Sequence, residues 1–258
     1  EIIVIDDNSS DNTSEIIESF KDVVLIRHEK NKGYGASIKS GINKSKFNFI
    51  AITDADGTYP NENILEFYKK LKTNNYDMIV GSRTGSNVNI PLLRRPPKWI
   101  LGKLANYVVN QNIPDINSGL RIFKKKSFIK FITIIPDGFS LTTTITLGMI
   151  SGGFNVEFED IDYFKRSGKS KIRPIRDTIN FFKLILRIGL YFSPKKIFMP
   201  ISIILFLAAI SWGLISKFYV GELADVSVLL LTIASFQTIL FALIAELINS
   251  RLPNNFKK

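Results

Sequence analysis

Short apolar runs alternate with segments of helical spacing between Glu1 and about Lys171. Apolar runs bounded by Gly, Pro, Asn or Asp predict strands, and apolar residues three and four apart predict helices. Strands that alternate with helices favour a mostly parallel sheet with crossover connections, and therefore an α/β fold. The predicted strands are Ile2–Ile5, Val23–Ile26, Phe47–Thr53, Met78–Val80, Arg121–Phe123, Val156–Phe158 and Ile161–Tyr163, and the longer predicted helices are Glu62–Leu71, Trp99–Val109 and Ser140–Ser151.

Two uncharged apolar runs, Ile197–Ser216 and Val226–Ala245, follow in the last part of the chain. Each is close to the roughly 20 residues that cross a bilayer as a helix. A buried helical hairpin is the alternative. Lysines or arginines lie before the first run and after the second, whereas the connector Lys217–Asp225 has one Lys and two acids. The positive-inside bias therefore predicts a cytoplasmic location for both outer ends and for the domain that precedes them.

The segment Ile175–Phe192 has helical amphipathic spacing. We expect one basic and polar face and, opposite it, an apolar face, which is typical of a helix that lies in the membrane interface. A surface helix packed on the preceding domain is the alternative. The polar face is formed by Arg176, Asn180, Lys183 and Arg187, and the apolar face by Ile179, Phe182, Leu186 and Leu190.

The formal net charge of +11 is concentrated in two segments. Arg83–Lys126 has nine Lys or Arg and one acid, and Lys165–Lys196 has ten and one acid. Such clusters indicate an anionic partner, which is a phosphate compound, a nucleic acid or an anionic membrane surface. The chain has no Cys, which excludes disulfides, thiolate metal sites and a Cys nucleophile. We interpret the single histidine, His28, as a residue at a strand end rather than a catalytic group.

Two carboxylates, Asp54 and Asp56, come at the end of the apolar run in Asn48–Pro60. Ligands bind outside the carboxyl ends of strands in open α/β sheets. Side chains at i and i+2 of an extended chain point the same way, so both carboxylates could face one pocket. Two hard oxygen donors suit Mg²⁺ or Mn²⁺. A simple turn is the alternative, because Asp and Gly are also common in turns.

Three further motifs combine glycines or small polar residues with cations. The turn Asn31–Gly35 is either a phosphate cradle or a tight connection between a strand and a helix, and we favour the connection because it lacks the full pattern of either known phosphate loop. Gly81-Ser82-Arg83 and Ser118-Gly119-Leu120-Arg121 each place an arginine beside a predicted strand. Arg166–Lys171 has the composition of a phosphate clamp or, alternatively, of a solvated basic loop.

Taken in order, these motifs resemble those of family 2 glycosyltransferases. The resemblance is strongest to the branch of dolichyl-phosphate mannose synthase and bacterial polyprenyl-phosphate glycosyltransferases. It implies a GT-A (nucleotide-diphospho-sugar transferase) fold, a nucleotide-sugar donor, a divalent cation and a polyprenyl-phosphate acceptor. The motifs are Val4–Thr13, Asn31–Gly35, Asp54–Gly57, Gly81–Arg83, Ser118–Arg121 and Arg166–Lys171.

The resemblance also implies roles for the matching residues. Asp7 lies where the family contacts the base, and Asp54 lies near the nucleoside and sugar of the donor. Asp56 matches the ligand of the metal that bridges to the diphosphate, with Asp54 beside it as the second candidate ligand. The cations divide into Arg83 and Arg121, which match acceptor-side and phosphate-binding residues, and Arg166, Lys169 and Lys171, which match the segment that closes over the phosphates.

The chain departs from the family pattern at two places. It begins with Glu1-Ile-Ile-Val-Ile, so we expect a fragment that lacks the family's first strand. Mannose synthases often have Gln two residues after the second Asp, where this chain has Thr58, so the resemblance does not specify mannose or a further metal ligand. We divide the chain into a GT-A domain (1–171), a juxtamembrane amphipathic helix (172–195), and a transmembrane hairpin with a short cytoplasmic tail (196–258).

We therefore expect an inverting, integral membrane hexosyltransferase. Its donor would be a UDP- or GDP-hexose and its acceptor undecaprenyl or dolichyl phosphate, rather than nucleic acid. The membrane would be the plasma membrane of a prokaryote or the endoplasmic reticulum of a eukaryote, and a homo-oligomer is left open. Two alternatives remain: a phosphotransferase of the haloacid-dehalogenase type, because Asp54–Thr58 also fits its Asp-x-Asp-x-Thr motif, and a membrane-anchored module that binds anions without catalysis.

Overall fold

The computed structural model describes residues 1–84, 95–138, 140–164, 174–221, 225–251 and 256. Helices alternate with strands up to residue 160, as the hydrophobic pattern predicts, and long helices follow. The strands are β1 (Ile2–Asp6), β2 (Val23–Arg27), β3 (Phe49–Ile52), β4 (Met78–Ser82), β5 (Arg121–Lys124) and β6 (Val156–Asp160). The helices are α1 (Thr13–Glu18), α2 (Tyr34–Lys44), α3 (Asn63–Thr73), α4 (Arg95–Val109), α5 (Lys125–Ile129), α6 (Leu141–Ser151), α7 (Pro174–Phe192), α8 (Pro194–Ile215) and α9 (Asp225–Arg251).

The strands form a parallel pair, β1 and β2, and a four-stranded sheet in the order β3-β5-β4-β6. The α/β prediction is confirmed, with β5 as the exception to the parallel pattern, since it runs antiparallel to both β3 and β4. The chain before β5 returns to the C-terminal end of β4, where Gly81 N donates to Leu120 O at 2.9 Å, so β5 must run back along it. The predicted strand Ile161–Tyr163 is wrong, because β6 ends where its partner β4 ends, at the pair Ser82 and Asp160.

Alternate residues of the four-stranded sheet fill two hydrophobic cores. Met78, Val80 and Phe123 belong to one core, which also contains residues of α5 and α6. Ile79 and Ile122 belong to the other, which contains Phe67 and Leu71 of α3 and Tyr59. The sheet is thus covered on both faces, and its C-terminal edge is left for polar side chains.

The turn before α2 is closed by another segment of the chain. Gly33 has φ +98°, and a Cβ there would lie 2.6 Å from the Asp137 carbonyl oxygen. A Cβ on Gly35 would overlap the Pro136 carbonyl oxygen, and Ala36 N donates to Asp137 O at 3.0 Å. The backbone of 136–137 therefore occupies the first turn of α2. This arrangement supports the tight connection rather than a phosphate cradle.

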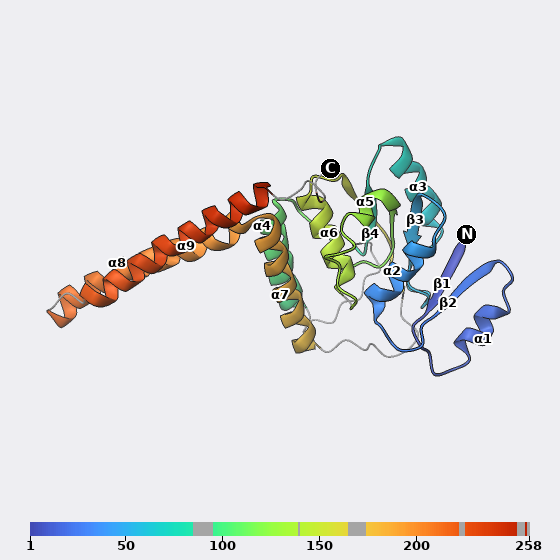
Figure 1. Ribbon diagram of the computed structural model, residues 1–258, viewed down its shortest axis with the longest axis horizontal. Coiled ribbons are helices and arrows are strands. Elements are labelled where there is room, and N and C mark those ends of the chain that lie inside the picture. Colours follow the sequence, from blue (N-terminus) through green and yellow to red (C-terminus); the bar gives the residue numbers. More distant parts are fainter. Residues whose placement is uncertain (85–94, 139, 165–173, 222–224, 252–255, 257–258) are drawn as a thin grey trace.

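The helices α8 and α9 form an antiparallel hairpin that projects from the α/β domain (Figure 1). Both are long and apolar enough to cross a membrane, and most of their side chains are exposed. The hydroxyls of Ser202 and Ser235 each lie 3.0 Å from the other residue's carbonyl oxygen, and both residues are 2% exposed. This contact joins the two helices in their apolar part, where an unpaired hydroxyl would be costly. Helix α8 continues into the π-helical segment Ser216–Val220, which ends at Gly221 with φ +80°.

Helix α7 runs across the root of this hairpin (Figure 1). Its residues Ile185 and Ile188 are buried with Ala105 and Val108 of α4. The sequence predicts one basic face and one apolar face for this helix. The structure shows a further apolar face, formed by Ile185 and Ile188, which packs on the domain. Ile179, Phe182 and Leu190 remain 48%, 44% and 42% exposed, and Lys183 and Arg187 are exposed beside them.

A Gly35→Ala substitution is expected to destabilise the protein, because the new methyl group meets a backbone carbonyl that cannot move without displacing 136–137. We expect a loss of about 1–3 kcal/mol, typical of overpacking, measured as the free energy of unfolding in detergent. The control is Gly102→Ala in α4, where a Cβ meets nothing within 4 Å. A Gly-to-Ala change inside a helix should stabilise by about 0.5–1 kcal/mol. Equal effects of the two substitutions would contradict the close approach.

Candidate active site

Three segments that the sequence predicts as site motifs meet at one edge of the four-stranded sheet. Arg121, the first residue of β5, is paired with Ile52 at the end of β3 and with Val80 of β4. The segments that follow β3 and β4 and precede β5 are therefore neighbours. A Cβ on Gly119 would lie 2.9 Å from Asp54 Oδ2, so the acidic motif touches the segment before β5.

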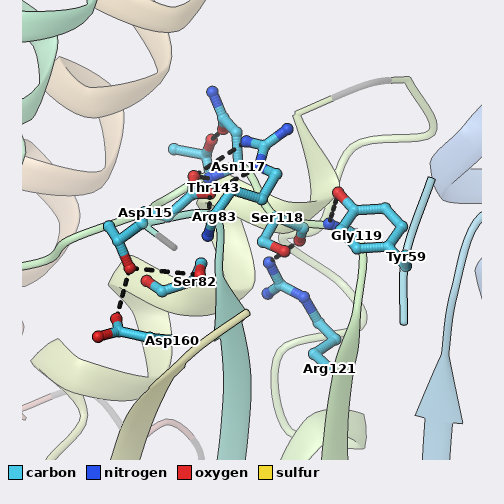
Figure 2. A network of polar contacts seen from close by, with 11 residues as sticks. Tyr59, Ser82, Arg83, Asp115, Asn117, Ser118, Gly119, Arg121, Thr143 and Asp160 are labelled. Carbon is cyan, nitrogen blue, oxygen red and sulfur yellow. Dashed lines mark hydrogen bonds and ion pairs between the residues drawn. The ribbon is translucent and has the colours of Figure 1, made fainter. Parts of the chain in front are cut away.

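Tyr59 and Tyr34 hold the acidic segment in place. The Tyr59 hydroxyl accepts a hydrogen bond from Gly119 N at 2.7 Å (Figure 2). The Tyr34 side chain, at the start of α2, is hydrogen-bonded to the Asp54 side chain. Burial and the negative charge of Asp54 raise the pKa of Tyr34 well above its usual value, so the hydroxyl stays protonated and donates to the carboxylate. Asp54 is thus oriented by a residue of the glycine turn.

Asp56 is oriented by Thr58. Its Oδ1 accepts hydrogen bonds from Thr58 N at 3.2 Å and from Thr58 Oγ1 at 2.6 Å. Gly57, between them, has φ +70°, which the missing Cβ allows. Thr58 is fully buried, so it positions Asp56 rather than serving as a ligand. The segment Asp54–Thr58 can therefore form a turn and still present its carboxylates to a ligand.

The donor set of Asp54 and Asp56 fits a hard divalent cation. Carboxylate oxygens suit Mg²⁺ and Mn²⁺, and Mg²⁺ in particular is commonly held by one or two carboxylates, with water and substrate phosphates completing its shell. Among the residues that the structure describes, no group of three or more His, Cys, Asp or Glu could enclose an ion.

Arg83 is fixed by Asp115 in a two-pronged ion pair (Figure 2). Its Nε and Nη2 lie 2.6 and 3.0 Å from the two carboxylate oxygens, and its backbone N donates to Oδ2 at 3.1 Å. Asp115 is 2% exposed, and the guanidinium lies 5.2 Å from the centre of the Tyr163 ring. Paired and stacked in this way, the Arg83 guanidinium has little freedom to reorient.

Arg121 is completely buried beneath this edge. Nη2 donates to Ser118 O at 2.5 Å, and Nη1 donates to Thr142 O and Thr146 Oγ1 at 3.3 and 3.1 Å, whereas Nε has no hydrogen-bond partner within the described part of the chain. The predicted phosphate contact is therefore not available in this conformation, because the guanidinium is enclosed by neutral groups. Burial lowers the pKa of Arg121, but an arginine remains charged in proteins. From this buried position the Arg121 charge can reach the surrounding groups only as an electrostatic field.

Asp7, which follows β1, contacts the two residues that immediately precede Tyr34. Its carboxylate accepts from Lys32 N at 2.8 Å and Gly33 N at 2.7 Å, and His28 Nδ1 lies 2.7 Å away. Burial raises the pKa of Asp7, but the hydrogen bonds from His28, Lys32 and Gly33 outweigh it and hold the pKa below its usual value. Asp7 and Asp54 are thus linked through the single turn 32–34.

The three remaining predicted cations, Arg166, Lys169 and Lys171, lie outside the described residues, and their roles stay predictions. Phe164, the last described residue before them, donates its backbone N to Thr58 O at 3.0 Å. The backbone at Phe164, just before that segment, is therefore hydrogen-bonded to the acidic motif.

Sequence reasoning missed the residues that orient the predicted ones. These are Tyr34, Tyr59, Asp115 and Tyr163. His28 lies at the end of β2, as predicted, but its contact with Asp7 was not expected. A signal was available for Asp115, the one acid among the nine cations of its segment. The tyrosines carry no such signal, because aromatic residues near strand ends usually belong to the core.

The chain matches two known sequence families. The family described as "Glycosyl transferase family 2" matches residues 1–132, and the "GtrB C-terminal hairpin" matches residues 193–251. A dolichyl-phosphate hexose transferase of Haloferax volcanii is 25% identical over 73% of this chain and 81% of its own length. A low-salt glycan biosynthesis hexosyltransferase of the same organism, Agl6, is 24% identical over 93% of this chain and 59% of its own length.

A solved structure of glucosyl-3-phosphoglycerate synthase from Mycobacterium tuberculosis, in complex with Mn²⁺, UDP and phosphoglyceric acid, has a similar fold. The TM-score is 0.58 at 13% identity, and the match covers 73% of this chain and 67% of that one. At this identity the likeness shows the fold alone, which is the GT-A fold expected from the sequence.

An Arg121→Met substitution is expected to change stability little, because it removes a buried charge that contacts no carboxylate. We expect the free energy of unfolding to stay within about 1 kcal/mol, which is a shift of about 2–4 °C in Tm. Phe123→Ala, in the same strand and equally buried, serves as the comparison and should lose about 3–5 kcal/mol. A loss of that size in Arg121→Met would mean that the arginine is kept for stability.

Proposed function

The chain belongs to glycosyl transferase family 2, and on this premise we propose that it transfers a hexose from a UDP- or GDP-sugar to a polyprenyl phosphate at the membrane. The observation that carries the proposal is the convergence, at one sheet edge, of the segment with Asp54 and Asp56, the segment with Arg83 and the segment before Arg121, in a chain with a hydrophobic hairpin. The match to the GtrB hairpin and the similarity to a dolichyl-phosphate hexose transferase support a lipid-linked acceptor.

This reaction needs no general base. A lipid phosphate is already anionic, so it can attack the anomeric carbon without losing a proton to the enzyme. The only histidine of the chain is engaged with Asp7 and Ser40. Attack on the face opposite the departing nucleotide inverts the anomeric centre. The enzyme's task is to hold two anions in contact, which is mainly a problem of position and charge.

Asp54 and Asp56 would hold Mg²⁺ or Mn²⁺, as their donor set allows. A cation bound there would offset the charge that develops on the departing diphosphate. The tyrosine and threonine that hold the two carboxylates fix their positions before a donor arrives. The mycobacterial synthase of similar fold was solved with Mn²⁺ and UDP, which supports a divalent cation and a nucleotide as ligands here.

The two arginines would serve different purposes. Asp115 already offsets the charge of Arg83, so this residue contributes directed hydrogen bonds rather than net charge. Arg121 contacts no carboxylate among its described hydrogen-bond partners, so its positive charge extends toward the site. In a site of low dielectric such a charge weakens the repulsion between diphosphate and lipid phosphate.

The membrane would hold α8 and α9 as spans and α7 in its interface. The exposed apolar residues of α7, with Lys183 and Arg187 beside them, suit the boundary between acyl chains and anionic headgroups. The chain would then divide into a catalytic domain (1–171), a juxtamembrane helix (172–195) and the hairpin with its tail (196–258), with the catalytic domain in the cytoplasm.

The phosphotransferase alternative is not favoured, because the family match covers the acidic motif and the segments around it. The other alternative, a membrane-anchored module that binds anions without catalysis, predicts that the unchanged protein transfers no sugar in the assay below.

Asp56→Ala is expected to reduce metal-dependent transfer to a short polyprenyl phosphate by about 100- to 1000-fold, as for loss of a preorganised electrostatic contact. The assay follows a radiolabelled hexose from UDP- and GDP-sugars into the lipid fraction with Mg²⁺ or Mn²⁺. Asp22→Ala, an exposed acid between α1 and β2, should retain full activity. Transfer by Asp56→Ala at the unchanged rate would rule out its proposed role, and absence of any transfer by the unchanged protein would favour the binding module.

The absence of Cys allows the membrane placement to be tested with single cysteines. In sealed vesicles, Phe182→Cys on α7 should react with a soluble maleimide at least about tenfold more slowly than Lys69→Cys on α3, because lipid would cover the former. Tyr219→Cys, in the π-helical segment that follows α8, should react only from the opposite side of the membrane. Equal rates at all three positions from one side would refute the arrangement.

A further inference from the structure

His28 is a buried titratable group that the proposed reaction does not use. It is 4% exposed, and its backbone N donates to Asp6 O at 2.9 Å, which extends the pairing of β1 and β2. Both ring nitrogens have polar neighbours. Nδ1 lies 2.7 Å from Asp7 Oδ1, and Nε2 lies 3.0 Å from Ser40 Oγ in α2. The ring therefore connects three separate elements of the domain.

The acceptor properties of Asp7 fix the direction of these hydrogen bonds. An ionised carboxylate can only accept, so Nδ1 carries a proton and donates to Asp7. In the neutral ring Nε2 is then an acceptor, and the Ser40 hydroxyl donates to it. Ser40, His28 and Asp7 thus form a chain in which each group donates to the next. Its end point is the carboxylate that the family resemblance assigns to the base of the donor nucleotide.

Asp7 is held from three directions but is not closed off. Lys32 N, Gly33 N and the His28 ring occupy part of its capacity, whereas a carboxylate offers about four lone-pair positions. The Asp7 side chain is 20% exposed, so its remaining acceptor positions can be reached by a ligand. A fixed group that can only accept favours a base whose ring nitrogen at the pairing edge carries a proton, as N3 of uracil and N1 of guanine do. It disfavours cytosine and adenine at that position, because their pairing-edge ring nitrogen is an acceptor and only their exocyclic amino groups could donate to the carboxylate.

We propose that His28 is a positioning residue for nucleotide recognition, which holds the Asp7 carboxylate so that it selects bases whose ring nitrogen at the pairing edge carries a proton. This inference rests on the proposed function, since it takes a nucleotide-sugar as the ligand. It adds a residue that acts through Asp7 and touches no substrate.

The same three side chain types also occur in serine hydrolases, but the geometry here does not suit a nucleophile. Ser40 lies inside α2, where the backbone N–H groups are used by the helix. No backbone donors of α2 are therefore left beside its hydroxyl to stabilise an oxyanion. The chain of hydrogen bonds ends at Asp7 in the turn region, which favours a role in positioning.

The experiment compares His28→Leu with His28→Asn in the full chain. Leucine removes both ring contacts, whereas the amide nitrogen of asparagine can donate to Asp7 from a place close to that of Nδ1. Calorimetric titration with UDP, GDP and CDP in detergent measures the Kd of each nucleotide without any transfer. Steady-state assays with the nucleotide-sugar separate KM from kcat. Melting temperatures show which variants are folded.

We expect His28→Leu to raise the Kd of the preferred nucleotide, and the KM of its sugar, about tenfold, with kcat changed less than about twofold. The preference over CDP should fall by a similar factor. His28→Asn should recover most of the affinity and preference, and Ser40→Ala should have a smaller effect in the same direction. If His28→Leu binds and discriminates like the unchanged protein, or if it loses affinity for UDP, GDP and CDP equally and asparagine fails to restore it, the proposal is overturned.

These outcomes are distinct from failure of the proposed function. A protein that binds UDP or GDP in a His28-dependent way but transfers nothing to a lipid phosphate would retain this inference and lose the lipid acceptor. A protein that transfers the sugar normally in His28→Leu would retain the function and lose this inference.

Discussion

The position of β5 between β3 and β4 is the constraint on which the site depends. Because β5 runs against both neighbours, its first residue lies beside their C-terminal ends. Backbone hydrogen bonds of the sheet thereby bring Asp54, Arg83 and Arg121 together from three distant parts of the sequence. Side chains refine this arrangement, as when Tyr59 accepts a hydrogen bond from Gly119. A parallel β5 would have placed Arg121 at the opposite edge.

The charged side chains of the candidate site are held in place by neighbouring residues. Thr58 orients Asp56, and Tyr34 orients Asp54. Asp115 orients Arg83, and its negative charge offsets the positive charge of the arginine. Arg121 differs, since it is enclosed by neutral acceptors and keeps an unpaired Nε within the described structure. Such a group costs stability, and its retention is easiest to understand if the site needs a fixed positive field.

Helix α7, which connects the α/β domain to the hairpin, has more than one apolar face. Helix α7 packs on α4 through Ile185 and Ile188 and leaves other apolar residues exposed beside basic ones. Beyond α9, the ring of Phe256 lies against Phe131 and Phe192. The orientation of the catalytic edge relative to α8 and α9 is therefore set by packing on both sides of the hairpin.

The sequence by itself determined the α/β class, the acidic motif at a strand end and the two long apolar helices. Each of these follows from the local spacing of apolar residues and from the residue types that form turns. It also supplied the ordered motifs that place the chain in its family. Only the tertiary structure decided that β5 is antiparallel, that Arg121 is buried, and that Arg83 pairs with Asp115, 32 residues away. The same holds for the third face of α7 and for the contact of His28 with Asp7. These features depend on which distant segments become neighbours, and a short stretch of sequence contains no information about that.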